Sequence, residues 1–333
     1  MPDPDTDETC DGPLFVVLAD GRDQEDFDVL FPALRDRGVN AMRCDPRDIT
    51  TEIEAGRIRF SVRGRLLAPA LVLGWVLDEV LDTGMVTLEL FAEAGIPIIN
   101  DAMTLFRAQN KILDSARLAT FGVTEYPVIS GHDPSELDDW MQQRGRRRVV
   151  VKPLRGYGGR GVQRVDDEQD LRHWQKSQRT EREPFYAMPW IENPGRDIRV
   201  YTVNHRPVFA MYRYAPDDSF VTNVRAGGSI AMCPLTADLI AVASRASRGA
   251  GTLIGGVDIG EDTVTGDLVV YEVNSCPSLE PAVLGEAASF LAAATRNLPV
   301  ALENWTPSYV YTQRDSDPDL FHASKQDLLR PGG

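Results

Sequence analysis

The sequence predicts a protein of mixed class, with an open α/β layer at the N-terminus followed by α+β lobes that end in an antiparallel sheet. Three observations predict this class. Short apolar strands alternate with helix-period segments over the first hundred residues, which is the pattern of an open α/β layer. From residue 197 onward, strand-like segments follow one another with few helices between them. The length of 333 residues suits two or three domains.

Composition and charge exclude several classes of protein. With 35 basic and 50 acidic residues the formal charge is −15, which disfavours broad nucleic-acid binding because that binding needs a basic face. No apolar run approaches the roughly 18 residues of a membrane span, and the acidic first residues lack the apolar region of a secretory signal. The four cysteines and four histidines are scattered, without the spacing of a zinc site. We therefore expect a cytoplasmic protein that binds neither nucleic acid nor membrane.

The first part of the chain is expected to form the α/β layer, as a domain over residues 13–104. A glycine at position 38 ends the first helix-period segment, as glycine often does. The elements expected here are an acidic, disordered leader at 1–12, strands at 14–19, 39–43, 71–73 and 96–99, helices at 23–37 and 83–94, and a hairpin over 57–67 that turns at Arg63-Gly64.

The rest of the chain is divided into a second region over 105–190, a third over 191–300 and a polar, poorly packed tail over 301–333. The expected elements are helices at 102–120, 134–143, 168–176, 237–249 and 284–295, strands at 126–129, 149–151, 185–188, 198–203 and 207–214, and a hairpin that pairs 256–259 with 268–273. The tail is expected to lose its packing beyond about residue 305.

A glycine-rich loop follows the apolar strand at 149–151. Four glycines lie within six residues, at 156, 158, 159 and 161, and glycines let backbone amides approach phosphate oxygens closely. The loop is neither a P-loop, because no Gly-Lys-Ser/Thr follows, nor a Rossmann fingerprint, because no helix opens behind it. A flexible hairpin turn is the alternative.

Lysine is scarce in this chain, and its positions are informative. Only Lys111, Lys152, Lys176 and Lys325 occur, against 31 arginines. Lys152 ends the strand before the glycine-rich loop, from where its ammonium group can reach a phosphate as a point charge. We therefore expect phosphate binding by this strand and loop.

Acidic and amide side chains gather on the predicted C-terminal hairpin. Glu272 and Asn274 alternate onto the same face of one strand, and Asp258 lies on the strand before the turn. Such oxygen ligands suit Mg²⁺. A solvent-facing polar stripe is the alternative, but the apolar residues beside them indicate burial, and a metal would offset the cost of burying carboxylates. We expect a metal at Asp258, Glu272 and Asn274.

Taken together, these motifs resemble those of the ATP-grasp ligases, and most of all the RimK-like group of carboxylate–amine ligases, which includes glutamate ligases and the lysine-biosynthesis ligases that act on a carrier protein. The resemblance covers roughly residues 14–295. The motifs that carry it, in order, are Lys111 on a helix, Lys152 before the glycine-rich loop, GRDIRVYTV, TNVRAGG, GVDIG and EVNSCPSLE.

The resemblance implies an ATP-grasp fold with an N-terminal pre-ATP-grasp domain, a lid subdomain and a C-terminal antiparallel lobe. ATP would lie between the lobes, with two Mg²⁺ ions, or Mn²⁺ in their place, at the metal residues named above. The residues implied to contact the nucleotide are Lys111, Lys152, Gly156, Tyr157, Gly158, Gly159, Gly161, the adenine hinge Met188, Pro189, Trp190 and Ile191, and also Asp197 and Asn223.

Such ligases phosphorylate a carboxylate with ATP, and an amine then attacks the acyl phosphate. Arg213 and Arg225, with Arg199 as a further candidate, would hold the carboxylate, since arginine grips carboxylates bidentately. Most arginines in so arginine-rich a chain are surface residues, which is the plain alternative. Cys276 is expected to be a spectator thiol, because nothing basic adjoins it in the sequence.

The chain departs from the family pattern at two positions. Pro189 stands in the hinge where relatives usually carry an acidic residue, which would leave adenine recognition to main-chain atoms. Val221 stands where the glutamate ligases often carry an arginine, which places the difference on the acceptor side. Trp190 could pack against adenine or belong to the core.

The expected function is therefore an ATP-dependent carboxylate–amine ligase that attaches an amino acid such as glutamate to a protein, cofactor or small-molecule acceptor. A dipeptide or natural-product ligase, similar to glutathione synthetase, is the alternative within this chemistry. An ATP-binding regulatory protein without turnover is the alternative of another class. Relatives often self-associate, so a homo-oligomer is left open.

Overall fold

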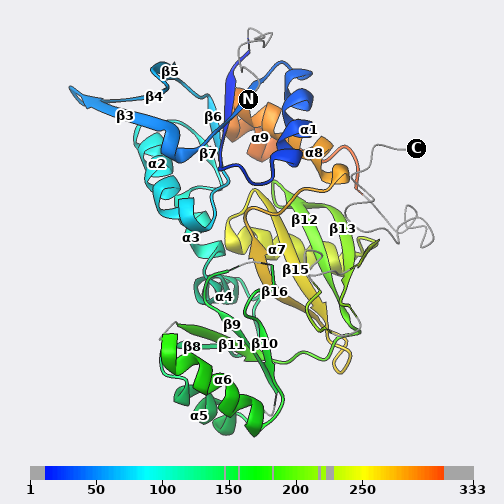
Figure 1. Cartoon of the computed structure of the whole chain (residues 1–333). Coiled ribbons are helices and arrows are strands. Elements are labelled where there is room, and N and C mark those ends of the chain that lie inside the picture. The colour runs from blue at the N-terminus through cyan, green and yellow to red at the C-terminus, as the bar shows by residue number, and fades with distance from the viewer. Residues whose placement is uncertain are drawn as a thin grey trace.

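The structure is a computed structural model that describes residues 12–145, 148–156, 158–181, 184–216, 219–222 and 229–310. Figure 1 shows an N-terminal layer at the top, a lid at the bottom and a C-terminal sheet between them. No helix in these ranges is long and apolar enough to cross a membrane. The predicted leader lies outside the described residues except for residue 12.

The N-terminal layer is built on a parallel sheet, and the open α/β layer that the sequence predicts is confirmed. Its order is β2-β1-β6-β7. Alternate residues of the buried strand β1 face opposite sides, so Phe15 and Val17 belong to one apolar cluster while Val16 and Leu18 belong to another. The bounds are β1 Leu14–Leu18, β2 Asn40–Cys44, β6 Leu71–Gly74 and β7 Ile98–Ile99, with helices α1 Gln24–Arg35, α2 Leu81–Glu93 and α3 Ala102–Ala108 and short 3-10 turns at Pro46–Asp48 and Asp78–Val80.

A small antiparallel sheet projects from this layer (Figure 1). It consists of β3 Ile49–Glu54, β4 Arg57–Val62 and β5 Arg65–Leu67. The predicted turn is confirmed, because Arg63 and Gly64 both adopt positive φ, at 51° and 76°, as a two-residue hairpin turn demands. The first strand of this sheet was not expected from the sequence.

The lid is an antiparallel sheet of order β10-β9-β11-β8. Two helices cover one face through Leu137, Trp140, Leu171 and Trp174. On the opposite face, Val150, Tyr186 and Met188 pack together in a smaller apolar cluster. The bounds are β8 Ile129–Gly131, β9 Val149–Pro153, β10 Gln163–Val165, β11 Phe185–Pro189, α5 Ser135–Gln143 and α6 Glu168–Glu181.

The C-terminal sheet is antiparallel and has the order β14-β13-β12-β15-β16. Helix α7 covers one face (Figure 1), and α8 and α9 join this sheet to α1 in one apolar core. The bounds are β12 Arg196–Val203, β13 Arg206–Tyr214, β14 Ser229–Met232, β15 Ile254–Glu261, β16 Leu268–Asn274, α7 Ala237–Ala250, α8 Pro281–Arg296 and α9 Leu298–Asn304. The strand β14 and the helix α9 were not expected.

The single helix expected over 102–120 is wrong. The helix is interrupted after α3, and a second helix, α4, spans Lys111–Thr120. Asn110 adopts an extended conformation, and its side chain accepts a hydrogen bond from the Leu113 N–H at 3.3 Å, so it caps the second helix as asparagine prefers to do. Lys111 therefore lies at the first helical position rather than inside a long helix.

The expectation of a poorly packed tail beyond about residue 305 is also wrong as far as residue 310. Trp305 is 8% exposed and packs edge to face on Phe290, with ring centroids 5.3 Å apart. The backbone N–H groups of Ser308 and Tyr309 both donate to the Glu286 carboxylate at 3.0 Å. The rest of the predicted tail lies outside the described residues.

One buried asparagine joins the N-terminal layer to the C-terminal sheet. Asn100 is 2% exposed, and its amide donates to the carbonyls of Ile254 and Ser275 at 2.7 and 2.9 Å. Its side-chain oxygen accepts from the Leu253 N–H at 2.9 Å. Its φ of 53° lies in the left-handed region, which asparagine tolerates better than most residues. Asn100 therefore fixes the start of β15 and the segment after β16 against the first sheet.

We expect Asn100→Ala to lower the free energy of unfolding by roughly 2–4 kcal/mol, because it leaves buried backbone groups without partners. Chemical denaturation of the purified variant measures this change. Asn304→Ala is the matched control, since Asn304 is exposed and makes one hydrogen bond, to the Val300 carbonyl, and it should change stability by less than about 0.5 kcal/mol. Equal effects of the two substitutions would contradict this role of Asn100.

Candidate functional site

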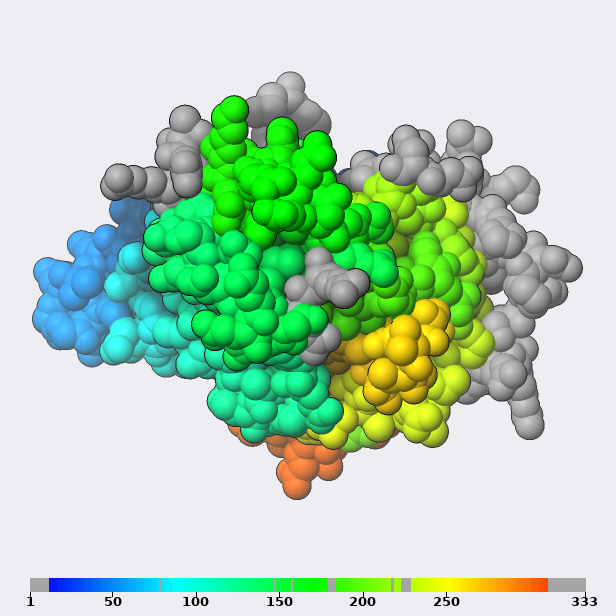
Figure 2. Space-filling model, turned by 90° about the horizontal axis from the view of Figure 1, so that it is seen from below, coloured from blue at the N-terminus to red at the C-terminus, as the bar shows by residue number. Residues whose placement is uncertain are grey.

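A cavity lies between the lid and the C-terminal sheet, and most of the predicted site residues line it. The predicted residues among its lining are Lys111, Lys152, Gly156, Gly158, Gly159, Met188, Pro189, Trp190, Ile191, Asp197, Arg213, Asp258, Glu272 and Asn274. Gly161 instead lines a neighbouring cavity. Tyr157, Asn223 and Arg225 lie outside the described residues. Figure 2 shows the lid, in green, with the turn between β15 and β16, in yellow, beside it. The segment that follows β11 reaches this turn, because the Thr263 N–H donates to the Glu192 carbonyl at 2.7 Å.

Strand alternation places the polar residues of the C-terminal sheet on the cavity side. Ile198 and Val200 of β12 face the apolar core under α7, so Asp197 and Arg199 face the cavity. On β15, Val257 and Ile259 belong to the same core, and Asp258 points the opposite way. The period of two therefore gathers charged groups from neighbouring strands on one face.

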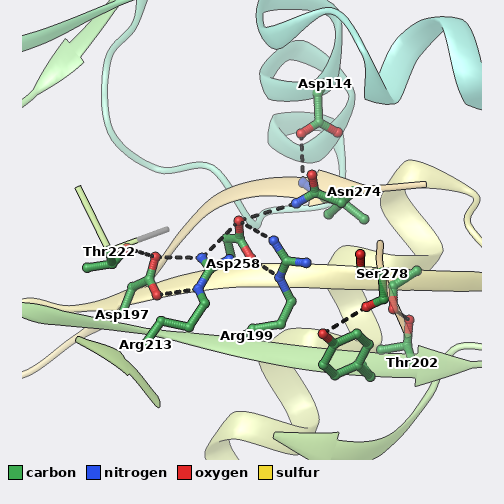
Figure 3. Close-up of polar contacts among 12 residues, drawn as sticks. Asp114, Asp197, Arg199, Thr202, Arg213, Thr222, Asp258, Asn274 and Ser278 are labelled. Carbon is green, nitrogen blue, oxygen red and sulfur yellow. Dashed lines mark hydrogen bonds and ion pairs between the residues drawn. The ribbon is translucent and has the colours of Figure 1, made fainter. Parts of the chain in front are cut away.

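Asp258 and Arg213 are the centre of a buried ion-pair network (Figure 3). Arg213 makes a bidentate pair with Asp197, at 2.7 and 2.6 Å, and also contacts Asp258 at 3.1 Å. Arg199 makes a second bidentate pair with Asp258, with one contact at 3.0 Å. Thr222 donates to Asp197 at 2.6 Å, and the Asn274 amide donates to Asp258 at 3.2 Å.

The charges in this network hold one another ionised. Burial by itself raises the pKa of Asp258, but the adjacent Arg199 and Arg213 guanidiniums outweigh it, and the pKa lies below its ordinary value. Burial likewise disfavours the charge of Arg213, yet Asp197 and Asp258 raise its pKa well above the ordinary value. The wall of the cavity is therefore a fixed set of charges rather than neutral groups.

The three predicted metal residues lie together on this wall. Asp258 pairs directly with Glu272 across β15 and β16, and Asn274 pairs with Gly256 two residues further along. The irregularity after Asp258 leaves Tyr271 as an extra residue, so Tyr271 and Glu272 both reach the cavity. The bulge was not predictable from alternation, and Tyr271 was missed for that reason.

The donor set fits a magnesium ion in its chemistry, since two carboxylates and an amide supply the oxygen ligands that Mg²⁺ prefers. No cluster of three or more His, Cys, Asp and Glu side chains suited to a metal occurs within the described part of the chain. Asp258 contacts two guanidiniums here, so it would have to exchange at least one of these partners for the ion. The metal site stays a prediction.

The two lysines lie on opposite elements of the same cavity. Lys111 begins α4, and its ammonium donates to the Gly156 carbonyl at 3.1 Å, while its N–H donates to the Leu154 carbonyl at 3.1 Å. Lys152 is the last residue but one of β9, and its Nζ lies 5.7 Å from the centre of the Tyr271 ring. Burial lowers the pKa of Lys152, and Glu272 opposes that effect. Both ammonium groups therefore lie where the glycine-rich loop meets the acidic wall.

The glycine-rich loop has a conformation that other residues rarely adopt. Gly156, Gly158, Gly159 and Gly161 have φ values of 136°, 73°, 74° and 69°, which favours glycine at each. A Cβ atom on Gly159 would lie 2.4 Å from Cγ1 of Val221, whereas one on Gly158 would meet nothing within 4 Å. Val221, a residue noted above as a departure from the family pattern, therefore packs against the loop.

The predicted hinge lines the cavity with an aromatic surface. The Trp190 ring packs edge to face on Phe220, with centroids 5.7 Å apart, and Arg164 stacks over it at 4.8 Å. Its backbone N–H already donates to the Arg148 carbonyl at 3.1 Å. Trp190 thus both packs against neighbouring side chains and lines the cavity. Thr222, the first residue of the TNVRAGG motif, also lines the cavity, and so does Phe220, which had no signal in the sequence.

Asp114 ties the helix of Lys111 to the acidic strand. It is 3% exposed, and its Oδ2 accepts a hydrogen bond at 3.1 Å from the N–H of Val273, which lies between Glu272 and Asn274 (Figure 3). Among the described residues β16 is the edge strand of its sheet, so Asp114 binds a backbone group that has no strand partner there. Burial raises the pKa of Asp114 well above its ordinary value. This residue was not expected from the sequence.

Cys276 is half-buried, and burial raises the pKa of its thiol. A thiol in that environment is a poor nucleophile, which supports its interpretation as a spectator.

Residues 108–286 match the family model of the RimK-like ATP-grasp domain. Over 198 residues the chain is 30% identical to a probable alpha-L-glutamate ligase of Alkalilimnicola ehrlichii, covering 59% of this chain and 65% of that protein. It is 32% identical over 189 residues to the tetrahydromethanopterin:alpha-L-glutamate ligase of Methanocaldococcus jannaschii, covering 55% and 63%. The chain thus spans just under two thirds of the length of these relatives.

Solved structures show the same fold. The ATP-grasp ligase PsnB, complexed with a phosphomimetic variant of its minimal precursor, Mg and ADP, superposes with a TM-score of 0.67 at 18% identity, covering 86% of this chain and 99% of that one. The D-cycloserine synthetase DcsG gives a TM-score of 0.63 at 21% identity, covering 85% and 100%. The fold expected from the motifs is confirmed.

We expect Gly159→Ala to weaken ATP binding more than Gly158→Ala does. Both substitutions cost about 1–2 kcal/mol for positive φ, about five- to thirtyfold in affinity, but only the methyl group at 159 collides with Val221. Calorimetric titration with ATP and Mg²⁺ measures the affinities. The double variant Gly159→Ala/Val221→Ala should recover the affinity of Gly158→Ala, and no recovery would disprove the proposed contact.

For Asp114, the substitution by Leu should lower the affinity for ATP and Mg²⁺ by about tenfold, because the Val273 N–H loses its acceptor and the strand of Glu272 and Asn274 can shift. Asp114→Asn keeps an acceptor oxygen and should bind within about threefold of the native protein. The same titration tests both variants. Equal affinities for Leu and Asn would mean that this hydrogen bond does not position the strand.

Proposed function

The chain belongs to the RimK-like ATP-grasp family, and we propose that it is an ATP-dependent ligase that joins a carboxylate to an amine with release of ADP and phosphate. One observation carries the proposal. Two of the four lysines, the positive-φ glycine loop and the wall of Asp258, Glu272 and Asn274 line a single cavity between two lobes. Such a cavity offers cations and hard oxygen ligands to a triphosphate from opposite sides.

In this proposal the nucleotide lies along the cavity from the hinge to the acidic wall. The segment from Met188 to Ile191 contacts adenine, with Trp190 beside it. Lys111, Lys152 and the glycine loop contact the phosphates. Asp258, Glu272 and Asn274 would hold two Mg²⁺ ions, or Mn²⁺ in their place, and the ions would neutralise phosphate charge. Tyr157, Asn223 and Arg225 keep the roles expected from the sequence.

The chain's own residues then orient the reaction. Arg213 and Arg199 hold the carboxylate of the substrate at the edge of the network, and one carboxylate oxygen attacks the γ-phosphorus while the bond to ADP breaks. An amine nitrogen then attacks the carbonyl carbon, phosphate leaves, and the amine loses a proton. Both lysines stabilise charge on the transferred group, and the closed glycine loop excludes water, which would otherwise hydrolyse the acyl phosphate.

We further propose that the group attached is an amino acid such as glutamate, on a protein, cofactor or small-molecule acceptor in the cytoplasm. Relatives named as alpha-L-glutamate ligases and as an alpha-aminoadipate–LysW ligase support an amino-acid substrate. Similarity to the fold of a D-cycloserine synthetase supports small free substrates less strongly, because it concerns the fold alone.

We expect the purified protein, supplied with ATP, Mg²⁺ and cell extract, to add one or more amino-acid residues to an acceptor, with ADP as product. Mass spectrometry of the extract and separation of the nucleotides measure both. Glu272→Ala should reduce turnover by on the order of 100-fold, as the loss of one group that stabilises the transition state does.

The control for this assay is Glu89→Ala, because Glu89 is an exposed acidic residue of α2 outside the cavity lining; it should retain native turnover. Formation of AMP instead of ADP would refute the mechanism. ATP binding without turnover in every extract would favour the regulatory interpretation, and products on free amino acids alone would favour a dipeptide ligase.

A further inference from the structure

Residues 219–222 belong to the chain between β13 and β14 of the C-terminal sheet, yet they contact the lid. The Phe220 ring packs edge to face on Trp190, which follows β11, with centroids 5.7 Å apart. The guanidinium of Arg164, on β10, lies over the same two rings at 4.8 and 5.6 Å. A side chain of the C-terminal lobe therefore packs together with side chains from two segments of the lid.

The next residue of the segment contacts the glycine-rich loop directly. Gly159 approaches Val221 so closely that a Cβ atom on the glycine would lie 2.4 Å from Cγ1 of Val221. Close-packed contacts transmit small displacements, because the packed interior of a protein is barely compressible. If the loop moves when it binds phosphate, Val221 must move with it or the contact must open.

The third residue joins the segment to the buried ion-pair network. The Thr222 hydroxyl donates to Oδ2 of Asp197 at 2.6 Å, and the same oxygen accepts from Nη2 of Arg213 at 2.6 Å (Figure 3). Nε of Arg213 donates to the other carboxylate oxygen of Asp197 at 2.7 Å. Because the guanidinium is planar and is held at two points, a turn of the Asp197 carboxylate turns the guanidinium as well.

This guanidinium connects the segment to the acidic wall of the cavity. Arg213 is 5% exposed, and its Nη2 contacts Asp258 at 3.1 Å. Val221 and Thr222 are consecutive, so their Cα atoms lie about 3.8 Å apart. A displacement that begins at the glycine-rich loop therefore reaches Arg213 through one peptide unit, one hydrogen bond and one ion pair.

We propose that Thr222 is a positioning residue, which aligns Arg213 for the carboxylate of the substrate once the glycine-rich loop holds a nucleotide. The inference rests on the proposed function, since that function places phosphates at the loop and a carboxylate at Arg213. Binding of the two ligands is then coupled, so that each raises the affinity for the other, and couplings between two sites are commonly about fivefold or more.

A purely structural role of Thr222 is the alternative, because a buried carboxylate needs hydrogen-bond donors whatever the site does. The two interpretations differ in the effect of the nucleotide. A structural hydroxyl stabilises the segment equally with and without nucleotide. A positioning hydroxyl is required for the nucleotide to reduce the motion of Arg213 and of the strands that carry this ion pair.

Hydrogen exchange of the full chain, measured by mass spectrometry with and without a nonhydrolysable ATP analogue and Mg²⁺, tests the proposal. In the native protein the nucleotide should slow exchange about fivefold or more in the glycine-rich loop and at the paired ends of β12 and β13, around Asp197 and Arg213. In Thr222→Val, which keeps the shape and removes the hydroxyl, the loop should stay protected while the slowing at the strand ends is lost. Thr222→Ser keeps the hydroxyl and should restore it.

Val221→Ala removes the contact with Gly159 from the other end of the path, so it should have the same effect, and it serves if Thr222→Val does not fold. Thr120→Val is the control, because Thr120 is exposed on α4 and its hydroxyl donates to the Arg117 carbonyl of the same helix. It should behave as the native protein does. Equal slowing at the strand ends in the native protein and in both path variants would overturn the proposal, as would a native protein whose loop alone is protected.

These outcomes are distinct from a failure of the proposed function. If the nucleotide protects neither the loop nor the strands of the native protein, it does not bind in the cavity, and the proposed function fails together with this inference. If the loop is protected in every variant, the nucleotide site is retained, and a missing difference at the strand ends removes only the role of Thr222.

Discussion

The carboxylate of Asp258, held between the guanidiniums of Arg199 and Arg213, is the interaction on which the site depends. Charges this deeply buried are tolerated only when each has a partner. Asp258 neutralises two arginines from two neighbouring strands, and Asp197 completes the balance of two positive and two negative groups. Without Asp258, the two guanidiniums would lie close together with a single carboxylate. The face of the C-terminal sheet that lines the cavity is therefore held in place by electrostatics as well as by packing.

From this network the rest of the site is positioned through α4. That helix carries Lys111 toward the glycine loop at one point and Asp114 toward β16 at another. The glycine-rich loop of the lid and strand β16 thus both contact residues in the first turns of α4, although they belong to different sheets. The same region lines the cavity between the lid and the C-terminal sheet, beside Arg199, Arg213 and Glu272.

Much of this arrangement follows from sequence patterns that act over short distances. Buried strands, alternation on the C-terminal hairpin and the glycine loop each depend on neighbours within a few residues, and they placed Lys152, Glu272 and Asn274 on the correct elements. Predictions from the sequence were wrong or incomplete where a single residue interrupts the regular pattern of a helix or strand. Asn110 caps a helix inside an apparently continuous pattern, and the bulge at Tyr271 adds a residue that alternation does not anticipate.

Contacts between segments that are far apart in the sequence could not be predicted, for a different reason. Val221 against Gly159 and Asp114 beside Val273 each join parts of the chain that are brought together only by the tertiary fold. No local period encodes such pairs. The candidate site could therefore be predicted as a set of residues, while the contacts that hold those residues in place required the structure.

A crystal structure of the protein grown with a nonhydrolysable ATP analogue and Mn²⁺, read from the anomalous signal of the metal, tests this site directly. We expect manganese peaks beside Glu272, Asn274 and Asp258, with the triphosphate between them and the ammonium groups of Lys111 and Lys152. A nucleotide bound elsewhere, or a triphosphate in the cavity whose metal lies away from all three residues, would contradict it.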